Sequence, residues 1–394
     1  MSKINPILIS LVLFDCGGIG HNYEYLNAIS KSTKEIGWQH YAALPINFND
    51  QDLKNGWRAC LLGCRKLDNR KENKLIKTFR LLFISFELAK SIHQYLNNIL
   101  SVADDISPTI IFIDSFKPSE LLSFLISLLF LSSRKLTVWL LYRHDDYQKN
   151  LIGFFYKIMN VLIEKIIANG KLVLLTDSEK LQDSLRFYFK RQVFIVPIPH
   201  TPTLEYFENI QTNQNKENIP ILSWWCGNPN PEKGLEIIQR LVTLADPMAK
   251  NLHLFISKEA YLPKTNNNFQ ITYLPAYLTR QAYLKQLMEI DILLLPYNSK
   301  IYKERTSGVF VEGICAGKIP FVTEGTWMAA ELIKYDLKEL VIDWTKDDVI
   351  ESICKFSKNA NIIQKIKTMQ KHYLVIHSAK SYSECIQKIY NTQT

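Results

Sequence analysis

The stretch from Glu304 to Pro320 carries residue types suited to binding a charged, hydroxyl-rich ligand. Two glutamates, Glu304 and Glu312, are separated by seven residues. The Ser307-Gly308 pair predicts the start of a helix and Gly317 its end, so Glu312 lies on the helix and Glu304 in the loop before it. The amides at this helix start can bind a phosphate, and Glu312 can accept two hydrogen bonds from ribose hydroxyls.

A glycine-rich turn follows the first apolar run, with Gly17, Gly18 and Gly20 close together. Glycine lets a backbone approach a ligand closely, and a helix start offers N–H groups to an anion. The pattern is not that of a nicotinamide site, because Tyr23 stands where the third glycine should be and no acidic residue ends a second strand. Two interpretations remain: a plain strand-to-helix turn, or a loop that a phosphate or sugar approaches.

Four polar residues, Arg143-His144-Asp145-Asp146, follow the apolar run 136–142. In open α/β sheets, ligands bind beyond the carboxyl ends of the strands, so this position suits chemistry. His144 could donate a hydrogen bond to a sugar hydroxyl or a leaving oxygen. The alternative is a solvated loop. We expect no metal at this position, because no second His or Cys lies nearby in the sequence.

Residues 54–80 are strongly basic, with nine Lys or Arg against two acidic residues, which is +7 of the chain's net +9. Trp57 and several leucines are interleaved with these charges. One interpretation is a solvated helix face, and the other is a surface for anionic lipid near the acceptor site. Nucleic acid is not an expected partner, because no motif supports it. We expect Cys60 and Cys64 on one helix, facing the core rather than binding zinc.

Apolar runs alternate with amphipathic segments along the chain, which predicts parallel sheets with helices on both faces. Strands are expected at 7–14, 109–113, 136–142, 171–176, 193–196, 220–225, 252–256, 270–274, 291–295 and 319–322. Helices are expected at 21–36, 121–131, 233–244, 280–288, 308–316 and within 347–390.

The 394 residues, 47% hydrophobic and 22% charged, predict two or three globular domains and exclude disordered, collagen-like or coiled-coil chains. A polar, apolar-free tract at 211–218 predicts a linker. We therefore expect an N-terminal domain at 1–205, a linker at 206–219 and a C-terminal domain at 220–394, whose terminal helical segment can pack back on the first domain. Seven scattered cysteines indicate a reducing cytoplasm. Since no apolar run approaches the ~20 residues of a membrane span, any membrane attachment is expected to be peripheral, at the inner face.

The motifs resemble those of retaining glycosyltransferases of the GT-B fold, in particular glycosyltransferase family 4, and they occur along the chain in the order of that family. The resemblance also rests on Trp225-Cys226-Gly227, on Glu232-Lys233-Gly234-Leu235 and on the run from Glu289 to Pro296, and it extends from Gly17 to Pro320. It implies an α/β chain of two Rossmann-like domains facing across a cleft. Two departures mark a divergent branch: Asn228 stands where the family has a phosphate-binding Arg, and Arg305-Thr306-Ser307-Gly308 replaces smaller residues.

The resemblance implies a hexosyltransferase-type enzyme (EC 2.4). Such an enzyme moves a sugar from a nucleotide-sugar to a saccharide or lipid-linked acceptor, with retention, in cell-surface glycan or polysaccharide synthesis. It implies no cofactor besides the nucleotide-sugar donor. Catalysis is assigned to His144 and Glu304, and donor binding to Gly18, Gly20, Gly227, Lys233, Arg305, Ser307, Gly308, Val309 and Glu312. Arg305 is included because the donor diphosphate needs a second positive charge, and not because the family pattern has an Arg at this position. The alternatives are a sugar-nucleotide epimerase and a non-catalytic GT-B protein that binds a nucleotide-sugar or a partner, and Asn228 favours the latter.

Overall fold

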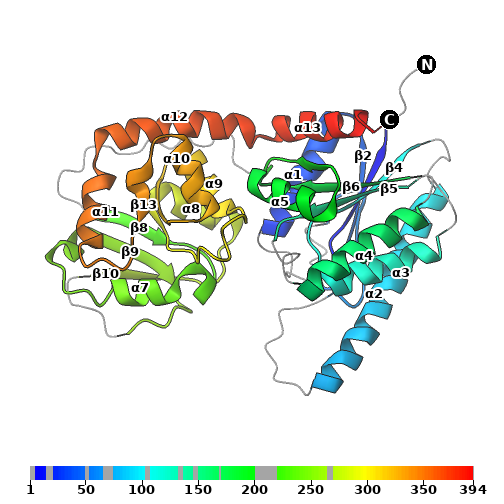
Figure 1. Ribbon diagram of the computed structural model, residues 1–394, viewed down its shortest axis with the longest axis horizontal. Helices are drawn as coiled ribbons and strands as arrows, with labels where there is room; N and C mark the ends of the chain where they lie inside the picture. The colour runs from blue at the N-terminus through cyan, green and yellow to red at the C-terminus, as the bar shows by residue number, and fades with distance from the viewer. Residues whose placement is uncertain are drawn as a thin grey trace. The chain divides into compact units, whose positions relative to one another are not determined.

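The computed structural model of the chain describes residues 5–14, 21–48, 53–64, 74–102, 107–131, 136–144, 150–167, 170–199, 220–263 and 269–393. The chain divides into two compact units, Met1–Pro199 with Tyr382–Thr394, and His200–Ser381 (Figure 1). Each unit is built on its own parallel sheet. The linker expected at 206–219 and the glycines at 17, 18 and 20 lie outside the described residues.

Unit 1 holds a seven-stranded sheet in the order β3-β2-β1-β4-β5-β6-β7, with every neighbouring pair parallel. The strands are β1 (Ile7–Leu11), β2 (Gln39–Pro45), β3 (Trp57–Leu61), β4 (Thr109–Ile113), β5 (Leu136–Tyr142), β6 (Lys171–Thr176) and β7 (Val193–Ile195). The helices are α1 (His21–Glu35), α2 (Lys74–Val102), α3 (Pro118–Leu129), α4 (Asn150–Ile166), α5 (Glu179–Phe189) and α13 (Ala379–Asn391).

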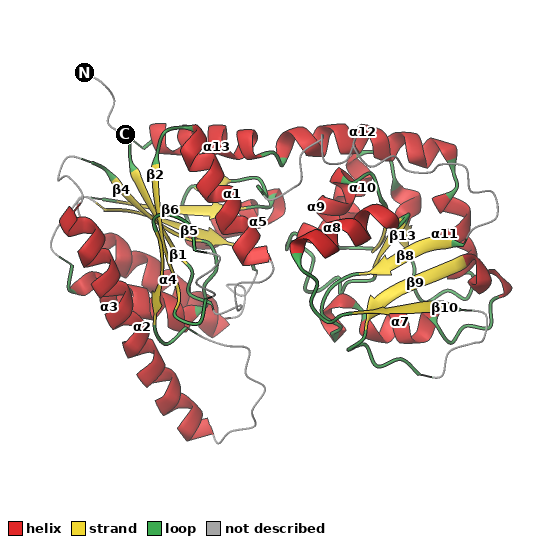
Figure 2. Ribbon diagram, turned by 180° about the vertical axis from the view of Figure 1, so that it is seen from behind, coloured by secondary structure: helices red, strands yellow, loops and turns green. Residues whose placement is uncertain are grey.

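Helices cover both faces of the unit 1 sheet (Figure 2). Successive side chains of β1 point to opposite faces, so Ile9 packs in one core with residues of α2, α3 and α4. Leu8 packs in a second core with residues of α1 and α13. The chain's last helix, α13, therefore belongs to the core of unit 1, where the Ser383 hydroxyl also donates a hydrogen bond to the Ser32 carbonyl.

Unit 2 holds a six-stranded parallel sheet in the order β10-β9-β8-β11-β12-β13. The strands are β8 (Ile221–Trp225), β9 (Leu252–Ser257), β10 (Gln270–Leu274), β11 (Ile292–Leu295), β12 (Ile319–Thr323) and β13 (Val341–Ile342). The helices are η3 (Pro231–Lys233), α7 (Leu235–Leu241), η4 (Pro247–Asn251), α8 (Arg280–Glu289), α9 (Gly308–Cys315), α10 (Trp327–Lys334), η5 (Lys338–Leu340), α11 (Val349–Ser357) and α12 (Ala360–Ile376).

The ten expected strands are all present, and the helices expected at 308–316 and within 347–390 are confirmed as α9 and as α11 to α13. The sequence-based expectation misses β2, β3 and β13. It was also wrong to place Cys60 and Cys64 on one helix, because Cys60 lies in β3 and Cys64 in the loop after it. β3 is an edge strand in which Trp57 is buried and Arg58 exposed, so within the basic stretch 54–80 it resembles a surface helix. Both cysteines do pack against the unit 1 core, as expected.

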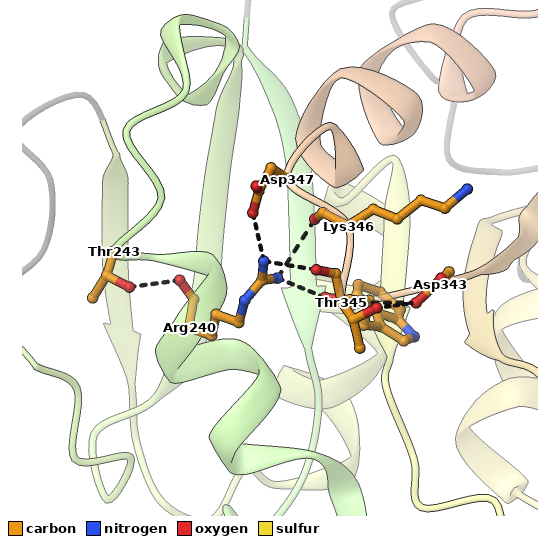
Figure 3. Close-up of polar contacts among 7 residues, drawn as sticks. Arg240, Thr243, Asp343, Thr345, Lys346 and Asp347 are labelled. Atoms are coloured by element: carbon orange, nitrogen blue, oxygen red, sulfur yellow. Dashed lines mark hydrogen bonds and ion pairs between the residues drawn. The ribbon is translucent and has the colours of Figure 1, made fainter.

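Arg240 at the end of α7 fastens the segment between β13 and α11 (Figure 3). Its guanidinium donates hydrogen bonds to the carbonyls of Trp344 and Thr345 at 2.7 and 2.8 Å. It also pairs with Asp347 at 2.8 Å. A single side chain therefore satisfies backbone acceptors that lie about a hundred residues further along the chain.

Candidate functional site

In the sheet of unit 2, the direction in which successive strands are added reverses between β8 and β11. From β8 the chain proceeds through β9 to the β10 edge, whereas β11 starts the half that ends at β13. Ligands in open parallel sheets bind beyond the carboxyl ends of the strands at such a switch point. Gly227 follows β8 at this point, and Tyr297 follows β11. The sequence-predicted donor residues of this unit belong to the segments that begin at these two strand ends.

Lys233 ends a short helical turn that is held from both sides. The Asn230 side chain accepts a hydrogen bond from the Lys233 amide, and the Trp225 indole donates one to the Lys233 carbonyl, each at 2.9 Å. Gly234 turns the chain with φ +81°, and a Cβ on it would overlap the Pro296 carbonyl. The turn therefore packs tightly against the segment after β11.

A second cation lies beside Lys233. Burial lowers the pKa of the Lys233 ammonium, and the nearby charge of Arg305 lowers it further. Arg305 itself pairs with Glu232 at 3.7 Å and stacks over the Tyr302 ring, 5.0 Å from its centre. Two positive charges in the segments that follow the neighbouring strands β8 and β11, one of them poorly solvated, are suited to binding an anion with several oxygens.

The N-terminus of α9 ends the loop that follows β11. Ser307 is the N-cap, and its hydroxyl accepts a hydrogen bond from the Phe310 amide at 3.3 Å. Gly308 and Val309 form the first turn, where backbone amides are oriented toward the helix start. Glu304 is half-buried in the loop between β11 and α9, next to Arg305. The helix start that the sequence predicts at Ser307-Gly308 is confirmed.

Glu312 has a fully buried side chain, and it is paired with a residue that sequence reasoning did not find. Its carboxylate accepts a hydrogen bond from Arg280 Nη1 at 2.6 Å. Burial, together with the charge of the Glu312 carboxylate, raises the pKa of the Tyr283 hydroxyl well above its usual value. Arg280 and Tyr283 lie on α8, about thirty residues before Glu312, and nothing in their local sequence indicates this pairing.

His144, the other expected catalytic residue, belongs to unit 1. It follows β5 and helps to line a small cavity of about 20 Å³ together with Asp114, Ser115 and Tyr156. Asp145 and Asp146 lie outside the described residues.

Beside His144, three neighbouring strands of unit 1 end in charged residues: Asp114 after β4, Arg143 after β5 and Asp177 after β6. Arg143 Nε lies 3.3 Å from Asp177, and its guanidinium stacks over the Tyr25 ring at 4.1 Å. Burial raises the pKa of the Asp114 carboxyl, and the Arg143 charge opposes that shift. The sequence shows these residues only as single polar positions after strands, so their grouping becomes visible once the strand order is known.

Solved structures share the arrangement of elements along nearly the whole chain. A sucrose-phosphate synthase from Thermosynechococcus elongatus matches with a TM-score of 0.63 and 12% identity over 98% of both chains. A glycosyltransferase from Rickettsia africae matches with a TM-score of 0.58 and 14% identity, also over 98% of both. The chain has the GT-B fold.

A putative UDP-N-acetylglucosamine 2-epimerase from Listeria monocytogenes is similar to this GT-B chain as well, with a TM-score of 0.57 and 10% identity over 99% of this chain and 98% of that one. No protein-family model matches the sequence, and no curated protein matches it either. These likenesses establish the fold of the chain. Its activity has to be argued from the residues at the switch point.

Among the described residues of the GT-B chain, no group of three or more His, Cys, Asp or Glu is placed to hold a metal ion. The charged groups at the unit 2 switch point include the cations Lys233 and Arg305. A third cation, Arg280, lies against Tyr283 and Glu312. This arrangement can neutralise an anion through side chains.

Proposed function

We propose that this GT-B protein is a glycosyltransferase that uses a nucleotide-sugar donor. The observation that carries the proposal is the pair of cations, Lys233 and Arg305, at the β8–β11 switch point beside the α9 N-terminus. A donor diphosphate has the charge and the number of oxygens to engage both side chains and the amides of Ser307, Gly308 and Val309. The glycosyltransferase among the similar structures supports the same assignment.

In the proposed reaction, the bond from the anomeric carbon to the diphosphate breaks and its electron pair stays on the diphosphate. The acceptor hydroxyl oxygen forms the new bond to the anomeric carbon, and its proton passes to the departing diphosphate. Lys233 and Arg305 stabilise the charge that grows on the departing diphosphate, which is where electrostatic catalysis has most effect. The close approach of the Lys233 ammonium to the backbone at Gly227 supports this role.

The finer assignments are carried over from the resemblance to glycosyltransferase family 4. They are retention at the anomeric carbon, a catalytic role for Glu304 at the donor sugar, and a hydrogen bond from His144 to a sugar hydroxyl or leaving oxygen. The half-buried position of Glu304 beside Arg305 and the cavity next to His144 support these roles. Asn228 cannot neutralise a phosphate. We therefore assign the role of the Arg that the family has at this position to another side chain of the same site.

For the acceptor, we propose a saccharide or lipid-linked molecule used in cell-surface glycan or polysaccharide synthesis, at the cytoplasmic face of a membrane. No described helix is long and apolar enough to cross a bilayer. The basic stretch 54–80 is the proposed contact with anionic lipid, although its residues 65–73 lie outside the described residues. Exposed apolar side chains follow it on α2, where Leu82, Phe83 and Phe86 are each more than half exposed. Apolar side chains next to basic ones are typical of helices that lie on membranes.

An epimerase acting on a nucleotide-sugar is a second candidate, because one of the similar structures is a putative UDP-N-acetylglucosamine 2-epimerase. A non-catalytic protein that binds a nucleotide-sugar is the third. Incubation with a panel of nucleotide-sugars separates the three. We expect slow release of free nucleoside diphosphate together with a free sugar that is not epimerised. A transferase gives these products when water replaces the acceptor. An epimerised sugar would indicate the second candidate, and binding without any turnover the third.

A further inference from the structure

Arg280 and Glu312 form an ion pair in which the arginine side chain is partly exposed to ligands and the glutamate side chain is not. The Glu312 side chain has no exposed surface, whereas 23% of the Arg280 side chain is exposed. Arg280 Nη1 and Glu312 Oε1 lie 2.6 Å apart. A ligand that enters this part of the site therefore meets the guanidinium before it meets the carboxylate.

A ribose could reach Glu312 only if this contact were broken. Separating this ion pair would leave the Glu312 charge buried without compensation, a cost that two ribose hydrogen bonds would not offset. A fully buried glutamate that accepts a hydrogen bond from a guanidinium is instead suited to fixing the orientation of that arginine.

Arg280 is connected to the Lys233 part of the site through residues that pack on β8. Tyr283 packs against Trp224 of β8, with ring centres 5.3 Å apart. The chain after β8 leads to Gly227, against which Lys233 Nζ lies. Arg280 stacks over Tyr283, 5.4 Å from the ring centre. Arg280 therefore lies over a residue that packs on β8, the strand whose carboxyl end leads to Lys233.

We propose that Arg280 contacts a phosphate group of the nucleotide donor and that Glu312 is a positioning residue that holds the guanidinium in place. This inference rests on the proposed function and deepens it. A guanidinium binds phosphate oxygens in a bidentate manner, and Arg280 would supply the positive charge that Asn228 lacks. The assignment replaces the expected ribose contact of Glu312 with an indirect role through Arg280.

The test compares ligands that differ only in phosphate. Uridine, adenosine and guanosine, each also as the mono- and diphosphate, are titrated into the protein by calorimetry, and the best-bound series is used for the variants. Arg280→Ala should weaken diphosphate binding at least tenfold and leave nucleoside binding within about twofold. Arg280→Lys should restore part of the loss, and Glu312→Gln should weaken the diphosphate alone. Lys285→Ala is the matched control, because it removes a well-exposed charge from the same helix.

Each outcome decides something. Unchanged diphosphate affinity in Arg280→Ala, with the fold intact by circular dichroism, overturns the inference. Equal losses for nucleoside and diphosphate in Glu312→Gln would return Glu312 to the ribose. Should the wild-type protein bind none of these nucleotides, the proposed function itself fails, and the inference with it. Because Arg280→Lys keeps the charge beside Glu312, it tests the geometry of the contact even if Arg280→Ala folds poorly.

Discussion

The ammonium of Lys233 occupies the space that a side chain on Gly227 would need. A Cβ atom built on Gly227 overlaps Lys233 Nζ, and Gly227 also has φ +98°. The glycine therefore serves two purposes, since it allows the turn after β8 and lets the cation lie directly against the backbone.

Gly227→Ala should displace the Lys233 ammonium and lower kcat/KM at least tenfold, because the charge can no longer reach the leaving diphosphate. Gly325→Ala is the matched control. It also has positive φ (+76°), but its Cβ would meet only Ser299 at an ordinary 3.5 Å. Both variants should lose a similar ~1–2 kcal/mol of unfolding free energy to backbone strain, whereas only the first should lose activity. Equal activity in the two variants would contradict the role of this contact.

Lys233→Ala should lower turnover at least tenfold, which corresponds to about 1.4 kcal/mol of barrier. The reason is the loss of charge stabilisation on the departing diphosphate. Steady-state rates with the active nucleotide-sugar are the measurement, and the exposed Lys300→Ala serves as control. EDTA should change the rate little. Strict dependence on magnesium or manganese would mean that an ion, rather than Lys233 and Arg305, stabilises the leaving group.

Lys318 should make stability depend on pH in the alkaline range. Its side chain is 6% exposed, its Nζ donates to the Met288 carbonyl at 2.8 Å, and burial lowers its pKa to about 8. Between pH 8 and 10.5 the unfolded chain binds this proton and the folded chain does not, so the free energy of unfolding should rise with pH, by up to about 3 kcal/mol. Urea unfolding of wild type and Lys318→Met across this range isolates the effect. A difference between the two that does not vary with pH would refute it.

Arg240→Ala should destabilise unit 2 by about 1.5–3 kcal/mol, because carbonyls of residues 344–346 lose a charged donor. Asp347→Asn should cost less than about 1 kcal/mol, since the Asp347 side chain is 94% exposed and its pairing is weakened by solvent. Urea unfolding measures both. Equal losses would show that the ion pair, rather than the backbone contacts, fastens this segment.

Attachment to membranes should be electrostatic and sensitive to salt. Each Lys or Arg near an anionic surface contributes about 1 kcal/mol, and the attraction weakens as the Debye length falls from about 10 Å at 0.1 M salt to 3 Å at 1 M. The protein should therefore pellet with anionic vesicles at low salt only. Reversal of four charges to Glu should abolish pelleting: Arg65, Lys66, Arg70 and Lys71. The control reverses four exposed lysines of unit 2: Lys355, Lys358, Lys367 and Lys371. A protein that stays in the supernatant at low salt would favour a soluble acceptor.

Much of the fold could be predicted from the sequence because its central strands are buried on both faces. Such strands read as continuous apolar runs, and 109–113, 136–142 and 171–176 were predicted with the bounds that the structure has. The edge strand β3 escaped detection because only Trp57 and Leu61 of its five residues are fully buried. Its one charged residue, Arg58, is exposed, and the sequence alone does not distinguish an exposed position on an edge strand from one on a solvated helix face.

The sequence by itself determined which residues follow strand ends, because Gly227, Lys233 and the Ser307-Gly308 helix start are specified by local turn and capping chemistry. Only the tertiary structure decided what those residues meet. Glu312 reads as an open hydrogen-bond acceptor in the sequence, yet it is buried against Arg280, 32 residues away. Likewise, Asp114, Arg143 and Asp177 come together because β4, β5 and β6 are neighbours in the sheet. Pairings of this kind depend on strand order and helix packing over long sequence separations, which leave no periodic signal in the local sequence.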